Sequence, residues 1–187
     1  TFRDIPKYNK DSLMSALGVK MLEGAEAKGM ILRWGDFEGA EMPWSSFQQA
    51  DLTGANLSHT NLSASNLSDA NLLDAVLQKA NLKNARLKGA NLKHVDLQGA
   101  DLTSASLQDA NLTGADLQKA KLSSASLSGA NLSGADLHGV DLRGADLRGV
   151  KSVTVKQLAP SIVDMRTRLP EGITFTQIQK YKAGEGN

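Results

Sequence analysis

The chain has 187 residues, 41% of them hydrophobic and 22% charged, and its 21 basic and 20 acidic side chains give a formal net charge of +1. It has no cysteine, which excludes a disulfide framework and thiolate chemistry, and no apolar run of about 18 residues that could span a membrane. These features predict one soluble, elongated domain. The lack of a secretory signal favours the cytoplasm, and the start at Thr1 leaves open a processed chain or a piece of a longer one.

Residues 1–29 are interpreted as an N-terminal segment and cap. Within them the stretch DSLMSALG begins with an N-cap residue, Asp11, and ends at Gly18, with apolar residues between. This pattern predicts a short helix over about 11–17 that covers the first coil of the structure that follows. The five-residue repeat described next is expected to begin already, imperfectly, at Leu22 and Ala27.

From Leu32 to Leu147 every fifth residue is large and apolar, and from Leu52 onward this residue is always leucine. No helix keeps such a stripe on one face, because five residues advance it by about 500°, and a strand would turn successive members to opposite sides. A column of small residues lies two positions before the leucines. A residue tolerant of positive φ, such as Gly54, recurs two positions after them. A corner every five residues closes a square in 20.

The unit reads small, Asn/Asp/Ser, Leu, polar, Gly/Asp/Lys, and it resembles the A-(D/N)-L-x-x motif of the pentapeptide-repeat family over about two thirds of the chain. The resemblance implies an all-β solenoid, a right-handed quadrilateral β-helix with four repeats in each coil. The 24 repeats from Leu32 to Leu147 then predict about six coils over residues 30–150. At roughly 4.8 Å per coil the column is about 29 Å tall. Each coil depends on its neighbours, so both ends need caps.

Residues 151–187 lack the repeat and are interpreted as a C-terminal cap and a disordered tail. A short helix is predicted over 154–159, where a proline follows and ends it. The stretch 169–172 is typical of a turn, and 173–178 favours a strand. The glycine-rich end, 183–187, is predicted to be disordered.

Motifs that would indicate catalysis are missing. The three histidines, His59, His94 and His138, fall at turn or outward positions of different coils and lack the spacing of a zinc site. The chain has no G-x-S-x-G elbow, no P-loop and no G-x-G-x-x-G. We therefore predict that the protein is not an enzyme and uses no cofactor, metal or small-molecule substrate.

Candidate binding residues lie on the outside of the column. Asp96, Asp116 and Asp136 share one outward column, in which like charges about 5 Å apart attract a cation or a basic partner, unless water and neighbours such as Lys119 dilute them. A second outward column is predicted to form a ladder of hydrogen-bonded amides, and its members are Asn71, Asn91, Asn111 and Asn131.

Apolar outward residues form a second group of candidates. Trp34 and Trp44 occupy the turn position on opposite sides of the first coil, and Leu73 and Val76 form a smaller apolar spot. Two alternatives stay open for the tryptophans: they pack under the N-terminal segment, or they contact another protein. A second copy could also dock through a terminal cap.

The sequence thus predicts a non-enzymatic scaffold or protein–protein interaction module whose partner it does not identify. One alternative is a DNA-mimicking modulator of a type II topoisomerase such as gyrase, a role that some family members perform with a strongly negative rod. Here residues 30–149 carry 13 acidic and 10 basic side chains. A belt of basic residues interrupts the acidic ones; its members are Lys79, Lys83, Arg86, Lys88 and Lys93. No aromatic residues lie among them to stack on bases, which argues against nucleic-acid binding. Another alternative is a repeat domain of a larger secreted or effector protein.

Overall fold

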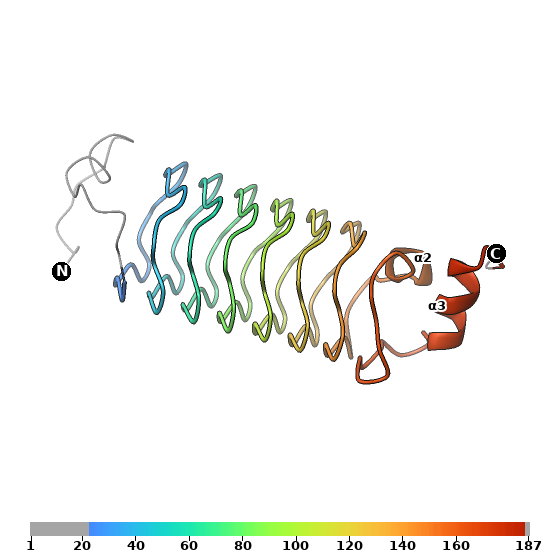
Figure 1. Cartoon of the computed structure of the whole chain (residues 1–187). Coiled ribbons are helices and arrows are strands. Elements are labelled where there is room, and N and C mark those ends of the chain that lie inside the picture. Colours follow the sequence, from blue (N-terminus) through green and yellow to red (C-terminus); the bar gives the residue numbers. More distant parts are fainter. Residues whose placement is uncertain (1–22, 186–187) are drawn as a thin grey trace.

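The computed structural model describes residues 23–185, which form a four-sided tube closed at its C-terminal end by two short helices (Figure 1). Helix α2 spans Val155–Leu158 and helix α3 spans Phe175–Lys182. The helix predicted over 11–17 and the repeat position Leu22 lie outside the described residues. No helix in the described part of the chain is long and apolar enough to cross a membrane.

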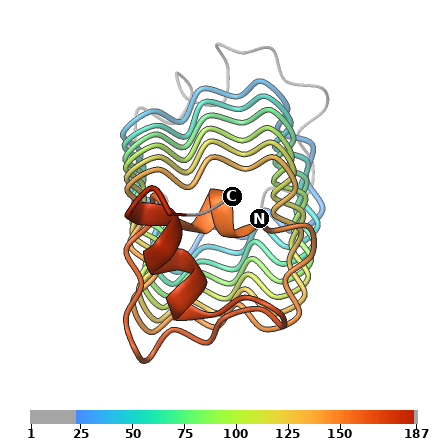
Figure 2. The same ribbon diagram turned by 90° about the vertical axis from the view of Figure 1, so that its right-hand side faces the viewer.

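Parallel β-bridges join each coil to the next, and they pair residues 20 apart from Glu26 and Ser46 to Asn131 and Lys151. Each side of a coil contributes a single bridged residue, so within residues 23–185 the sheet consists of columns of isolated bridges and has no extended strands. The view down the tube shows the four sides in register (Figure 2). We number these sides 1 to 4 by the leucines that they carry, Leu52, Leu57, Leu62 and Leu67, and their equivalents 20 residues apart.

A left-handed backbone residue turns the chain at each corner, as the sequence predicts. The φ angle is 63° at Gly54, 58° at His59 and 55° at Lys79. Non-glycine residues hold this conformation at a modest steric cost, because the surrounding coils fix it. The corner at Gly54 is closed by a hydrogen bond from the Ala55 N–H to the Leu52 carbonyl, at 3.0 Å.

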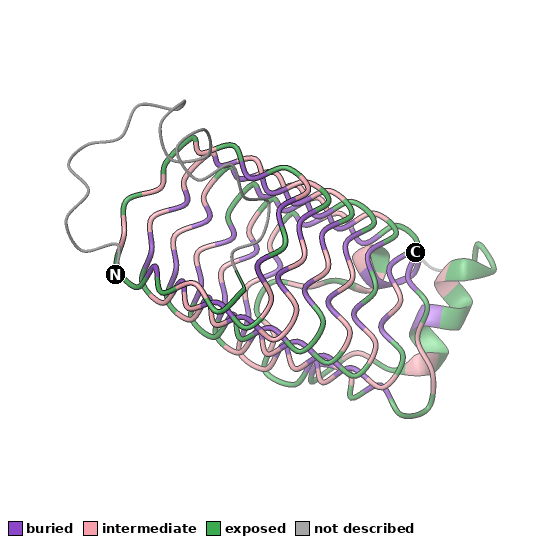
Figure 3. Cartoon of the chain, turned by 60° about the vertical axis from the view of Figure 1, so that its left-hand side comes forward, coloured by how far each residue is buried: buried purple, intermediate pink, exposed green. Residues whose placement is uncertain are grey.

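The interior of the tube is filled by the leucine column and the small-residue column, which appear as the buried segments in Figure 3. Each leucine contributes roughly 1.5–3 kcal/mol of transfer free energy. Thr60 and Ser65 replace alanine in the small column, and their hydroxyls donate to the carbonyls of Leu57 and Met42. Ala27 is also buried, so the repeat in the structure extends towards the N-terminus beyond Leu32.

At the C-terminal end, α2 replaces side 2 of the last coil. After α2 the chain returns to the column, because Ile162 bridges Asp141 on side 3 and Arg168 bridges Asp146 on side 4. The helix predicted over 154–159 is therefore confirmed, and it begins with a capping box formed by Thr154 and Gln157.

The strand predicted over 173–178 is wrong, because this segment enters α3. A capping box of Thr174 and Gln177 starts the helix, and its one fully buried side chain, Ile178, packs against the end of the tube. The turn predicted over 169–172 is confirmed by a hydrogen bond from the Ile173 N–H to the Pro170 carbonyl. Residues 183–185 are not a free tail, since the Gly184 and Glu185 N–H groups bond back to the carbonyls of α3.

The side chain of Gln157 makes hydrogen bonds to the preceding coil where side 2 of the last coil is missing. Its Nε2 donates to the carbonyls of Leu132 and Ala135 at 3.1 and 3.2 Å. One coil earlier, the equivalent carbonyl of Ala115 accepts the N–H of Asp136 instead.

Replacing Gln157 with alanine is therefore expected to lower the free energy of unfolding by about 1–3 kcal/mol, because two carbonyls and the capping box lose their partner. Urea unfolding followed by circular dichroism measures this loss. Gln179→Ala on the exposed face of α3 is the matched control and should change little. Equal effects of the two substitutions would contradict the capping role of Gln157.

Candidate functional site

Most leucines of the repeat are preceded by Asn or Asp, and this residue has a structural task in the corner that follows it. Its side-chain oxygen accepts a hydrogen bond from the backbone N–H two residues later, as in Asn56 with Ser58 at 3.1 Å and Asp96 with Gln98 at 3.0 Å. Short side chains with an acceptor oxygen make this turn. The Asn and Asp residues of the repeat are thus explained by the fold, without a ligand.

The predicted amide ladder on side 1 is present only in part: Asn71 and Asn91 are joined, whereas in the described residues no side-chain hydrogen bond joins Asn91 to Asn111 or Asn111 to Asn131. Asn91 donates from Nδ2 to Oδ1 of Asn71 at 2.8 Å, and Asn71 donates to the Thr53 hydroxyl at 2.9 Å. On side 3, Asn81 donates to Asn61 at 3.1 Å. These bonds tie neighbouring coils together outside the core.

The carboxylates of Asp96, Asp116 and Asp136 do form one column, on side 2, and glutamine amides lie between them. Gln78 donates to Asp96 at 2.6 Å, and Gln98 donates to Asp116 at 2.8 Å. The pKa of Asp136 is lowered, chiefly by the hydrogen bond from the His138 backbone N–H. Within residues 23–185 no group of three or more acidic or histidine side chains could hold a metal ion. The column is therefore held by hydrogen bonds from glutamine amides to the aspartate carboxylates.

The largest exposed apolar side chains of the first described coil are Ile31, Trp34 and Trp44, which are 76%, 63% and 70% exposed. The Trp34 ring lies over the backbone of Gly54, since a Cβ atom placed on Gly54 would come within 2.1 Å of two ring atoms. The indole is thus supported from below and open to solvent above. Sequence reasoning missed Ile31, although it stands where later repeats carry Asn or Asp before the leucine.

Leu73 and Val76 lie on either side of the corner between sides 1 and 2, and both are only half-buried. Val76 bridges Asn56 and Asp96, so it takes the place of a polar residue in the column. The spot is smaller than the surface around Trp34.

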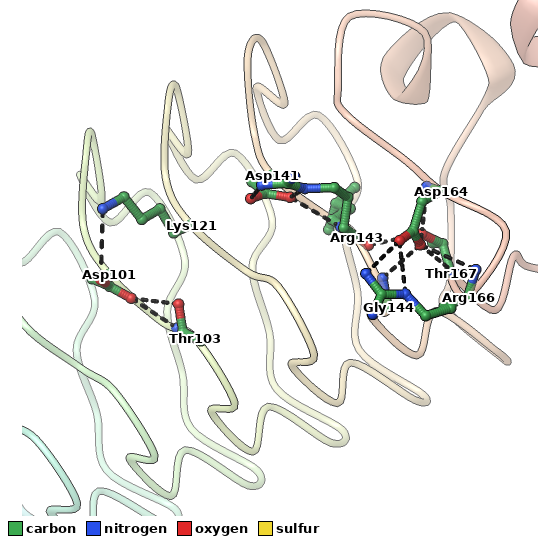
Figure 4. Close-up of polar contacts among 10 residues, drawn as sticks. Asp101, Thr103, Lys121, Asp141, Arg143, Gly144, Asp164, Arg166 and Thr167 are labelled. Carbon is green, nitrogen blue, oxygen red and sulfur yellow. Dashed lines mark hydrogen bonds and ion pairs between the residues drawn. The ribbon is translucent and has the colours of Figure 1, made fainter.

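A further group that the sequence reasoning missed lies at the C-terminal end, where three Asp-x-Arg segments form ion pairs. Arg143 and Arg148 each hold the aspartate two residues earlier through Nε and Nη2, at 2.9 and 2.7 Å. Arg166 holds Asp164, whose carboxylate also accepts the N–H of Gly144 (Figure 4). For the first two segments the signal was the spacing, since the residues on either side of an inward leucine both face outward; Met165, between Asp164 and Arg166, is instead 87% exposed.

These contacts lower the pKa values of the carboxyl groups at this end. The hydrogen bond from Arg148 is the main cause that brings the pKa of Asp146 to about 2. Burial raises the pKa of Asp164, but hydrogen bonds from Arg166 and the Gly144 N–H outweigh it and bring the value to about 2.

We expect the C-terminal cap to lose stability as the pH falls from about 4 towards 2. A carboxyl group whose pKa is lower in the folded state stabilises the fold above its unfolded value, about 3.9, and loses this contribution as it is protonated in the folded state. Amide exchange of residues 139–168, measured through this pH range, tests it. Arg148→Gln raises the folded-state pKa of Asp146 towards its unfolded value, so it should reduce the stability lost over this pH range, and an unchanged profile would contradict the role of the pair.

A tube of 20-residue coils with a leucine interior and one bridge per side defines a four-sided β-helix of repeated pentapeptides. The chain belongs to the pentapeptide-repeat family, whose profile, described as pentapeptide repeats, matches it in eight copies. The matched segments are residues 31–69, 45–84, 70–109, 80–118 and 110–149. Comparison with curated proteins finds no significant match.

Solved structures of the family are similar to most of the chain. The pentapeptide-repeat protein alr5209 from Nostoc PCC 7120 is 30% identical, and the match covers 71% of this chain and 80% of that one, with a TM-score of 0.35. HetL from Nostoc sp. strain PCC 7120, involved in heterocyst differentiation regulation, is 24% identical over 86% and 95% of the two chains, with a TM-score of 0.29. QnrB1, a plasmid-mediated fluoroquinolone resistance protein, is 16% identical over 90% and 98%, with a TM-score of 0.39.

Proposed function

We propose that the protein is a non-catalytic, rigid scaffold that binds a protein partner through the exposed apolar surface formed by Trp34 and Ile31. The observation that carries this proposal is the Trp34 indole, held flat over Gly54 with its outer face open. Tryptophan is among the residues most often found at the energetic centre of protein interfaces. A ring already fixed by the backbone loses little freedom on binding.

The surroundings of Trp34 indicate the chemistry of the partner. Ile31 extends the apolar surface, and the exposed carboxylates of Asp36, Glu38 and Glu41 lie on the adjoining sides 2 and 3. Their side-chain hydrogen-bond partners are neutral amides, since Asn56 donates to the first two and Asn61 to the third. A protein surface with an apolar pocket and basic residues around it would complement this arrangement.

A DNA-mimicking role at gyrase has less support. Residues 30–149 have a charge balance of only −3, and the Asp-x-Arg pairs neutralise carboxylates near the C-terminal end. The structurally similar proteins are a resistance protein and a regulator of differentiation, so the shared fold does not select a role. A gyrase supercoiling assay with and without a quinolone tests this alternative, and no effect at micromolar protein would remove it.

Site-specific photo-crosslinking tests the proposed surface. A benzophenone amino acid replaces Trp34 in one variant and His138 in another, because His138 is also exposed but lies on side 2 far along the tube. In extract of the source organism, position 34 should give an adduct of defined mass that position 138 does not give. Glu38→Lys should weaken the capture of the same protein at low salt. Equal adducts at both positions, or none, would overturn the proposal.

Intrinsic fluorescence separates a free surface from one that the chain itself covers. Trp34 and Trp44 are the two tryptophans of the chain, so the emission reports on this end alone. The isolated protein should show the red-shifted, readily quenched emission of solvent-exposed indole. Blue-shifted emission that Trp34→Phe abolishes would mean that residues 1–22 or a second copy occupy the surface, and it would contradict a free docking site.

A further inference from the structure

A hollow of about 410 Å³ lies at the C-terminal corner between sides 3 and 4, at the opposite end of the tube from Trp34. Its lining includes Ser124, Ser126, Gly144, Asp146, Arg166 and Arg168. We propose that this hollow binds a phosphoryl group, either as free phosphate or on a phosphorylated peptide segment.

The stacking of the coils places hydroxyl groups on one wall and guanidinium groups on the other. Ser126 bridges Asp146, and Asp146 bridges Arg168, so these residues lie in register on three successive coils. At the adjoining corner, Ser124 and Arg166 lie on either side of Gly144. A Cβ placed on Gly144 would come within 3.5 Å of the Ser124 hydroxyl and 4.0 Å of the Arg166 Cβ. The absent side chain of Gly144 leaves the space open.

Donors on both walls are free to receive a ligand. The side chain of Arg168 makes only a long contact, 3.5 Å from Nη1 to Asp146, which leaves Nε and Nη2 unused. Arg166 holds Asp164 through Nε and Nη2, which leaves Nη1. Within residues 23–185 the hydroxyls of Ser124 and Ser126 have no hydrogen-bond partner.

The charge of the hollow favours an anion. Asp146 is matched by Arg148 and Asp164 by Arg166, each through short hydrogen bonds to the guanidinium. Asp146 is ionised at neutral pH, since its pKa is about 2, but Arg148 already balances its charge. Arg168 is therefore a surplus positive charge at this corner.

The donor arrangement suits a phosphoryl group better than a carboxylate. A phosphate monoester carries three strong acceptor oxygens and close to two negative charges at neutral pH. Its tetrahedral oxygens can accept from the serine wall and the arginine wall together, whereas the two coplanar oxygens of a carboxylate match one guanidinium.

Titration of the ¹⁵N-labelled full chain, followed by amide chemical shifts, tests the proposal. The probes are inorganic phosphate and a phosphoserine peptide, with its unphosphorylated form as reference, at an ionic strength held constant with chloride. Saturable shifts centred on the amides of Ser124, Ser126 and Gly144 are expected. Tighter binding of the phosphopeptide would identify a phosphorylated partner, and tighter binding of inorganic phosphate would identify a site for the free ion.

Arg168→Gln should weaken binding by about tenfold or more, the effect of losing one charge-assisted hydrogen bond. Arg143→Gln is the matched control, because Arg143 lies at the same end in the same kind of Asp-x-Arg pair but does not line the hollow. Ser126→Asp places a negative charge on the other wall and should abolish binding. Shifts that do not saturate, or that Arg143→Gln reduces as much as Arg168→Gln, would overturn the proposal. Neither outcome affects the surface around Trp34.

Discussion

Replacing Leu97 with alanine is expected to lower the free energy of unfolding by about 2–5 kcal/mol. Leu97 is 0% exposed, and the leucine column places Leu77 and Leu117 in the coils on either side of it. In a stack where each coil contacts only its neighbours, a cavity in a central coil weakens the interfaces above and below it. Urea unfolding followed by far-UV circular dichroism measures the loss.

Leu73→Ala is the matched control for Leu97→Ala. The same atoms are removed, but Leu73 faces outward and is only partly buried, so its loss should cost less than about 1 kcal/mol. Similar losses at the two positions would contradict the division into inward and outward leucines on which the tube depends. An altered dependence on urea for Leu97→Ala alone would indicate that the column separates into two unfolding units.

The repeat region could be predicted from the sequence because every position of the pentapeptide has one physical task. The leucine fills the interior, the small residue lets the chain turn inward, and the residue at positive φ forms the corner. The bridges between Asn71 and Asn91 follow from the same period, because 20 residues return the chain to one side. In such a column, one correct register places every side chain of the repeat.

The C-terminal cap lacks this period, so its secondary structure could be predicted only from local sequence patterns. The strand predicted over 173–178 was wrong. Ile173 and Phe175 alternate with polar residues and favour a strand, yet Thr174 and Gln177 form a capping box that starts α3. The end of the tube selects the helix, because it offers a site for Ile178, the one fully buried residue of α3. Tertiary packing of this kind is not encoded in a short window of sequence.

The candidate surfaces could be predicted only in part, for a related reason. The outward position of Trp34 follows from the period. Its contact with the Gly54 backbone depends on which residue occupies the same corner in the next coil, 20 residues later. The phosphoryl-binding hollow depends on Gly144 and on a loop that rejoins the column after α2, so Arg166 and Arg168 reach side 4 from outside the repeat. Each site therefore depends both on positions that the repeat fixes and on a residue or loop that does not follow the repeat.

Ile178→Asp is expected to detach α3 and to make the protein associate at its C-terminal end. Ile178 is 0% exposed, α3 packs on α2, and Lys182 donates to the Ser161 carbonyl at 2.9 Å. A buried carboxylate without a partner costs more than the docking of α3 contributes, so the helix leaves and exposes apolar residues and backbone groups of the last coil. An uncovered end of a stacked β structure pairs with other chains.

Size-exclusion chromatography with light scattering should therefore show a mass that rises with concentration for Ile178→Asp. The free energy of unfolding of the cap should fall by about 2–5 kcal/mol, as for loss of a large buried side chain. Gln179→Asp adds the same charge to the exposed face of α3 and should behave as the unmodified chain. If Ile178→Asp keeps its mass and its helical signal, α3 does not protect the end of the tube, and stability at this end must come from α2 and Gln157 alone.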